Sequence, residues 1–153
     1  MSAYAIERAI DIDAPVDVVW RTITEPDKIR TWFADAVELD ARPNGEGTLR
    51  FRVDEPDPLV VPITVVTVDR PRTFAYRWIP QPDRHPGPGN AVLVTFTLEP
   101  DGDTRTRLRV VETGVDELDW PEAEKREYVK DHLEGWAEHG GRLQTLFEDT
   151  AAS

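Results

Sequence analysis

The hydrophobic pattern of this chain changes its period once, near residue 119, and that change limits the folds open to it. Before this point apolar residues alternate with polar ones in short segments, which is the pattern of half-buried β-strands. After it, apolar residues recur at alternating spacings of four and three, which places them along one face of a long α-helix. The residues of this stripe are Val129, Leu133, Trp136, Gly140, Leu143 and Phe147. Strands followed by one long amphipathic helix predict an α+β domain in which the helix covers a curved antiparallel sheet.

Seven strands and two short helices are expected ahead of the long helix. The strand segments are residues 4–13, 36–41, 48–54, 59–69, 73–79, 91–99 and 104–113. Pro15 can open the first short helix, and a second begins near residues 24–27 and carries Trp32 and Phe33. Asp119 is expected to cap the long helix, because Glu122 three residues later completes a capping box. Residues 80–90 contain four prolines and two glycines and are expected to form a loop.

Composition excludes several classes of function. The 153 residues include no cysteine, which excludes disulfides, thiolate zinc sites and cysteine nucleophiles. The two serines, Ser2 and Ser153, stand at the chain ends, so a serine nucleophile is also excluded. A net charge of −12 repels nucleic acid and anionic lipid headgroups. Because we find neither a signal-peptide pattern nor an apolar run long enough to span a membrane, we expect a cytoplasmic protein without membrane insertion.

Several short segments resemble those of one known family. The opening segments are Ile6-Glu7-Arg8-Ala9-Ile10, Ile12-Asp13-Ala14-Pro15, Val19-Trp20, Thr24-Glu25-Pro26 and Trp32-Phe33. The later segments are VTFTLE at residues 94–99, Glu112-Thr113-Gly114, and Gly135-Trp136 with Leu143 and Leu146. Along nearly the whole chain they are similar to domains like the C-terminal part of the activator of the heat-shock-protein-90 ATPase. Such domains belong to the START-like, or SRPBCC, superfamily, which shares the helix-grip fold of the birch pollen allergen.

The resemblance implies a single START-like domain over residues 1–153. Its fold is a curved antiparallel sheet of about seven strands, with two short helices after the first strand and a long C-terminal helix over the concave face. Relatives use the cavity between sheet and helix to bind lipids, hormones or polyketide-like molecules, which implies a small hydrophobic or amphipathic ligand. The resemblance implies no shared catalytic residues. Because the chain has no counterpart of the co-chaperone's N-terminal half, we do not expect a full co-chaperone role.

Two charged residues, Arg8 and Glu112, are expected on the inner face of the sheet. Arg8 alternates in phase with Ile6 and Ile10, and Glu112 alternates in phase with Val110. In the resembled fold the first and last strands are neighbours, and we expect their register to set Arg8 directly against Glu112. A buried charge needs an opposite partner. The pair is then either a polar anchor for a ligand or a closed structural ion pair, and both interpretations stay open.

Aromatic side chains and one histidine complete the predicted ligand site. The aromatic members are Trp32, Phe33, Phe51, Tyr76, Trp78, Phe96 and Trp136. They either line a pocket or fill an ordinary core, since aromatic residues dominate both. His132 lies one turn before Trp136 and is either a polar pocket residue, a general acid or base, or a satisfied boundary residue. His139 lies too far along the helix to share a metal ion with His132, so no metal site is predicted.

Three functions are compatible with these residues. The first is binding of a small hydrophobic or amphipathic molecule, which burial holds and Arg8, Glu112 or His132 orients. The second is an enzyme similar to the polyketide cyclases or aromatases of the same fold, in which His132, Glu112 or Tyr76 moves a proton. The third is a co-chaperone-type module that binds a protein partner through its surface. We expect the first, with no catalytic residues and no cofactor.

Overall fold

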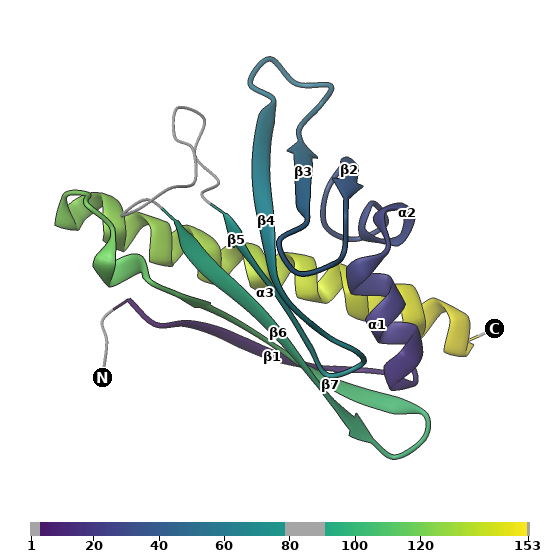
Figure 1. Ribbon diagram of the computed structural model, residues 1–153. Coiled ribbons are helices and arrows are strands. Elements are labelled where there is room, and N and C mark those ends of the chain that lie inside the picture. Colours follow the sequence, from purple (N-terminus) through teal and green to yellow (C-terminus); the bar gives the residue numbers. More distant parts are fainter. Residues whose placement is uncertain (1–3, 79–90, 153) are drawn as a thin grey trace.

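The expected α+β helix-grip fold is confirmed. The computed structural model describes residues 4–78 and 91–152, with residues 148–152 as backbone only, so the loop expected at residues 80–90 lies outside the described residues. The described chain forms a seven-stranded antiparallel sheet, two short α-helices and one long α-helix. Figure 1 shows the sheet strongly twisted, with the long helix lying across it. No helix in the described part of the chain is long and apolar enough to cross a membrane.

The strands follow one another across the sheet almost in chain order. The elements are β1 (Ile6–Ile12), α1 (Val16–Thr24), α2 (Pro26–Ile29), β2 (Ala36–Leu39), β3 (Glu46–Phe51), β4 (Leu59–Asp69), β5 (Thr73–Trp78), β6 (Val92–Asp101), β7 (Arg105–Thr113), the 3-10 helix η1 (Val115–Glu117) and α3 (Glu122–Ala152). The order in the sheet is β1-β7-β6-β5-β4-β3-β2, so β1 and β2 form its two edges. The first strand therefore pairs with the last, as the resemblance implied.

Two predicted helix boundaries are wrong. The helix α2 ends at Ile29, so Trp32 and Phe33 lie in the turn that follows it. The helix α3 begins at Glu122, so its N-cap position is Pro121 and not Asp119. The carbonyl of Pro121 accepts the backbone hydrogen bonds of the first turn, which moves the helix start past the predicted cap.

The predicted pairing of Arg8 with Glu112 is wrong, although the two strands are neighbours. One row of residues crosses β5, β6, β7 and β1 and consists of Tyr76, Val94, Glu112 and Ile6. Arg8 lies in the next row, opposite Val110, and is exposed. Because β1 is an edge strand, the long Arg8 side chain reaches water without a buried partner. Glu112 must therefore find its partners elsewhere.

Aromatic side chains fill most of the space between the sheet and the helices. The buried members of this cluster are Trp20, Trp32, Phe33, Phe74, Tyr76, Trp78, Phe96, Tyr128 and Trp136. Small cavities lie between these side chains in the described part of the chain, and two of them measure about 10 Å³ each. That is about the space one water molecule needs. The predicted cavity between sheet and helix is therefore filled over much of its length, and the larger open space lies at its side.

Candidate functional site

The face that α3 turns toward the sheet carries three side chains with polar tips. Tyr128, His132 and Trp136 follow one another at intervals of four residues, which places them above one another on one side of the helix. The predicted stripe put Leu133 on this face, but Leu133 is 37% exposed, whereas Tyr128 is 2% exposed. The helix is rotated so that hydrogen-bond donors meet the buried carboxylate of Glu112. Tyr128 was missed, and its spacing of four from His132 was the available signal.

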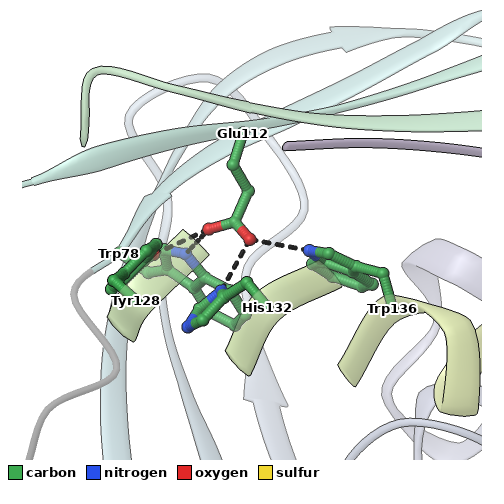
Figure 2. Close-up of polar contacts among 5 residues, drawn as sticks. All are labelled: Trp78, Glu112, Tyr128, His132 and Trp136. Carbon is green, nitrogen blue, oxygen red and sulfur yellow. Dashed lines mark hydrogen bonds and ion pairs between the residues drawn. The ribbon is translucent and has the colours of Figure 1, made fainter. Parts of the chain in front are cut away.

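Glu112 receives four hydrogen bonds from these and one further side chain (Figure 2). Its Oε1 accepts from Nε1 of Trp78 at 3.0 Å and from the hydroxyl of Tyr128 at 2.7 Å. Its Oε2 accepts from Nε1 of Trp136 at 2.7 Å and lies 2.6 Å from Nδ1 of His132. The strands β5 and β7 supply Trp78 and Glu112, and α3 supplies the other three. An ionised carboxylate offers about four acceptor sites, and here all four are used.

This arrangement keeps Glu112 ionised although it is 1% exposed. Burial raises the pKa of a carboxyl group, but the charge of His132 and the hydrogen bonds from His132, Tyr128 and Trp136 outweigh it and lower the pKa of Glu112 below its usual value. Burial and the nearby charge of Glu112 raise the pKa of Tyr128 well above its usual value. The phenol therefore stays protonated and donates to the carboxylate.

The carboxylate also fixes which nitrogen of His132 carries a proton. Because an ionised Glu112 can only accept, Nδ1 of His132 must be the donor in the bond between them. The imidazole stacks on Tyr128 with 3.8 Å between ring centroids, and its edge meets Trp78 at 5.7 Å. Figure 2 shows its second nitrogen, Nε2, pointing away from Glu112. In the neutral ring Nε2 is an acceptor, able to hold a ligand hydroxyl or to take up a proton.

A pocket of about 600 Å³ opens beside His132. It lies between the middle of α3, the turn after α2, and the ends of β3, β4 and β5. Five of the ten predicted ligand-binding residues line it: Phe33, Phe51, Trp78, His132 and Trp136. The other lining residues are Asp35, Arg52, Glu55, Leu59, Asp131, Gly135, Glu138, His139 and Arg142. That the five predicted residues contact a ligand stays a prediction.

The pocket has an aromatic wall and a charged rim. Phe33 stacks on Trp136 with ring centroids 5.3 Å apart, and Phe51 meets the edge of Phe33 at 5.4 Å. At the rim Arg142 pairs with Glu138 at 2.7 Å, on side chains that are more than half exposed. Such a pocket suits a molecule with an apolar body and a polar end.

His139 is a second imidazole on the pocket wall. Its Nδ1 lies 3.3 Å from the carbonyl oxygen of Trp32, so Nδ1 must donate and Nε2 is left as an acceptor. Burial lowers the pKa of His139, which favours the neutral ring. No group of three or more metal-binding side chains comes together in the described ranges, which include both histidines.

The other predicted site residues lie outside this pocket. Glu112 lies behind His132, in the interior. Arg8, Trp32 and Phe96 border one of the two 10 Å³ cavities, with Arg8 exposed at its side. Tyr76 lines the second small cavity, where its buried hydroxyl has no hydrogen-bond partner among the residues that the structure describes.

A comparison with family models assigns the chain to a protein family. Residues 13–148 match the model described as Activator of Hsp90 ATPase homolog 1-like protein. The chain belongs to this family. The matched residues include α1, the whole sheet after β1, and the part of α3 that holds Tyr128, His132 and Trp136, so the resemblance predicted from the sequence is confirmed. No curated protein matches this member of the Activator of Hsp90 ATPase homolog 1-like family.

Solved structures with the same fold are numerous. Protein MLL2253 from Mesorhizobium loti is 22% identical, with a TM-score of 0.75, and the match covers 95% of this chain and 98% of that one. The Aha1 dimer from Colwellia psychrerythraea is 16% identical, with a TM-score of 0.71 and coverage of 94% and 96%. DynU16, from the dynemicin biosynthetic locus, is 21% identical with a TM-score of 0.71, and the match covers 96% of this chain but 48% of DynU16. At such identities the likeness is evidence for the fold alone.

Proposed function

We propose that this member of the Activator of Hsp90 ATPase homolog 1-like family binds a small amphipathic molecule in the pocket between α3 and the ends of β3, β4 and β5. The observation that carries the proposal is the pairing of an aromatic wall with one imidazole, His132, that a buried carboxylate orients. The volume of about 600 Å³ falls in the range of roughly 300–1,000 Å³ typical of small-molecule pockets. Binding there needs no covalent chemistry.

The side chains of the pocket favour a neutral ligand that carries a hydroxyl group. Its apolar body packs against Phe33, Phe51 and Trp136. Its hydroxyl hydrogen-bonds with Nε2 of His132, since a hydroxyl can donate to a neutral ring and accept from a protonated one. Four of the lining residues are acidic and two are arginines, so the pocket offers an anion no net attraction. A carboxylate-bearing ligand is therefore disfavoured relative to an alcohol or a phenol.

Two glycines of α3 allow a matched test. A Cβ atom added at Gly135 or at Gly141 meets no atom within 4 Å, but only Gly135 lines the pocket. Gly135→Leu should therefore fill the pocket without disturbing the core, and Gly141→Leu serves as its control. We expect calorimetric titration with 2-naphthol to show binding to the wild type and to Gly141→Leu, and at least tenfold weaker binding to Gly135→Leu.

Two outcomes would count against the proposal. Equal affinity of 2-naphthol for Gly135→Leu and wild type would place its binding elsewhere on the protein. Absence of 2-naphthol binding, together with native mass spectra of the purified protein that show no co-purified small molecule, would argue against a ligand-binding role altogether.

A second candidate function is proton transfer on a carbonyl compound, and the 2.6 Å contact of Glu112 with His132 favours it. In this reaction Nε2 of His132 takes a proton from the carbon next to the carbonyl group, and the bonding pair forms an enolate. The imidazolium then returns a proton from solvent to the same carbon. Incubation of 2-tetralone in D₂O tests this by NMR: faster deuterium exchange with wild type than with His132→Ala supports it, and equal rates exclude it.

The remaining predictions stay proposals. We propose that residues 1–153 act as a single START-like domain in the cytoplasm. Binding of a protein partner through the surface has weaker support, because the exposed large apolar side chains of the described ranges are Val53, Val60 and Leu133.

A further inference from the structure

The hydroxyl of Tyr76 is buried and unpaired among the residues that the structure describes. Tyr76 lies on β5 and is 3% exposed. It points to the same side of the sheet as Glu112, in the same row of paired residues. Buried hydroxyl groups in native proteins nearly always have a hydrogen-bond partner. This hydroxyl therefore requires an explanation.

A water molecule is a poor partner for this hydroxyl. Tyr76 lines the interior cavity of about 10 Å³ together with Phe74, Phe96, Trp32 and aliphatic side chains. The indole nitrogen of Trp32 already donates to the carbonyl oxygen of Thr22 at 3.0 Å. A buried water needs two to four polar partners and at least this much space. The apolar surroundings suit an oxygen atom that arrives on an apolar molecule.

Phe33 separates this interior cavity from the open pocket, because it lines both. It is 8% exposed and lies in the turn after α2, outside any helix or strand. Ring contacts hold it on the pocket side, including Trp136 at 5.3 Å and His139 at 4.9 Å. Phe33 is the residue that the two linings share, so its ring is the candidate barrier between the two spaces.

We propose that the pocket has an inner subsite, in which Phe33 swings aside and a neutral carbonyl or ether oxygen on the apolar end of the ligand accepts a hydrogen bond from Tyr76. This inference rests on the proposed binding function and names the ligand's second polar group. The ligand then carries a hydroxyl near His132 and an acceptor oxygen at its buried end.

Electrostatics decide between a neutral and an anionic oxygen. Burial, and to a lesser degree the charge of Glu112, raise the pKa of Tyr76 well above its usual value, so the phenol stays a donor. The same charge of Glu112, two strands away in the same row, repels a carboxylate at this place. A ketone, ester or ether is therefore the class of acceptor that fits.

The test compares two probes that differ in one carbonyl group, 4-phenyl-2-butanone and n-butylbenzene. Tyr76→Phe removes only the hydroxyl and keeps the ring, so the variant should fold, which thermal unfolding checks. We expect Tyr76→Phe to weaken the binding of the ketone about three- to tenfold, the range for one net hydrogen bond, and to leave butylbenzene unchanged. The infrared carbonyl stretch of ¹³C-labelled ketone should lie at lower wavenumber on the wild type than on Tyr76→Phe.

The movement of Phe33 is tested separately with Phe33→Leu, which keeps an apolar side chain but removes the ring. We expect several-fold faster association of 4-phenyl-2-butanone in stopped-flow measurements, because the passage is then wider. An unchanged or slower association rate would overturn the role of Phe33.

Failure of the inner subsite can be told apart from failure of the proposed function. If the ketone loses no affinity in Tyr76→Phe, or does not bind the wild type, the inner subsite is overturned. If 2-naphthol still binds and Gly135→Leu still blocks it, the proposed binding function stands without the subsite. If 2-naphthol does not bind the wild type and native mass spectra show no co-purified small molecule, the proposed function fails as well.

Discussion

Replacement of Glu112 with glutamine tests the buried network at constant size. In the native protein Trp78 and Tyr128 donate to one carboxylate oxygen, and His132 and Trp136 donate to the other. Glutamine keeps one of these oxygens and puts an NH₂ group, itself a donor, in place of the second. Whichever way the amide turns, one indole N–H, that of Trp78 or of Trp136, faces the NH₂ group and loses its acceptor. The group that shares the same position, the Tyr128 hydroxyl or the His132 ring, can instead accept from the NH₂ group by turning its O–H or changing its tautomer.

The expected loss of stability follows from that one indole donor. A buried donor left without its acceptor costs about 1–3 kcal/mol. Loss of the charge does not offset this, because the lowered pKa of Glu112 means that the folded protein favours the ionised form. We therefore expect Glu112→Gln to lower the free energy of unfolding by about 2 kcal/mol, a clear fraction of the roughly 5–15 kcal/mol usual for a domain.

Urea unfolding at pH 7, followed by tryptophan fluorescence and circular dichroism, measures this loss. The matched control is Glu138→Gln, which neutralises a carboxylate on α3 whose side chain is 63% exposed in a surface pair with Arg142. Such a pair contributes about 1 kcal/mol or less. A loss below about 1 kcal/mol in Glu112→Gln, or one equal to that of Glu138→Gln, would refute the argument that the four bonds support a buried charge.

Four further perturbations have expected outcomes. The pKa of Glu112 is lower in the folded protein than its ordinary 4.5, so its contribution to stability is complete above pH 4.5 and is lost as the pH falls below that value. Below pH 4.5 the urea midpoint of Glu112→Gln should therefore depend less on pH than that of the wild type. The pKa of His139 is likewise below its ordinary 6.5, so stability should begin to fall below pH 6.5, and less so in His139→Asn, which keeps a donor for the carbonyl it contacts. Gly135→Ala and Gly141→Ala should each raise the free energy of unfolding by about 1 kcal/mol, because alanine is the better helix former and the added methyl meets no atom. Tyr76→Phe should be neutral or stabilising by up to roughly 2 kcal/mol, because it removes a hydroxyl unpaired among the described residues; a clear loss in thermal unfolding would mean that the hydroxyl has a partner.

The fold could be predicted because its signals are local. Alternation marked each strand to within a few residues, and the one change of period marked α3. The register between β1 and β7 could not be predicted in the same way. A shift of two residues keeps every side chain on its own face, so the pattern around Arg8 and Glu112 fits either register. The alternation along β7 therefore predicted correctly that Glu112 lies inside, but the predicted register between β1 and β7 gave it the wrong partner.

The candidate site depends on contacts that no single segment encodes. The stripe on α3 is broad enough to fit two rotations of the helix, and the buried carboxylate of Glu112 selects the one that turns Tyr128 and His132 inward. The rim of the pocket adds Asp35 and Arg52 from segments far from α3 in the chain. Only the folded arrangement brings these segments together.

The central claim is that an ionised, buried Glu112 fixes His132 with Nε2 facing a pocket that takes a ligand. NMR of protein labelled with [¹⁵N]histidine tests it directly, at a pH where the ring is neutral. We expect Nδ1 of His132 to show the shift of a protonated nitrogen and Nε2 that of an unprotonated one, and the Nε2 resonance to move when 2-naphthol is added. The reverse tautomer, or an Nε2 resonance that saturating 2-naphthol leaves in place, would contradict the claim.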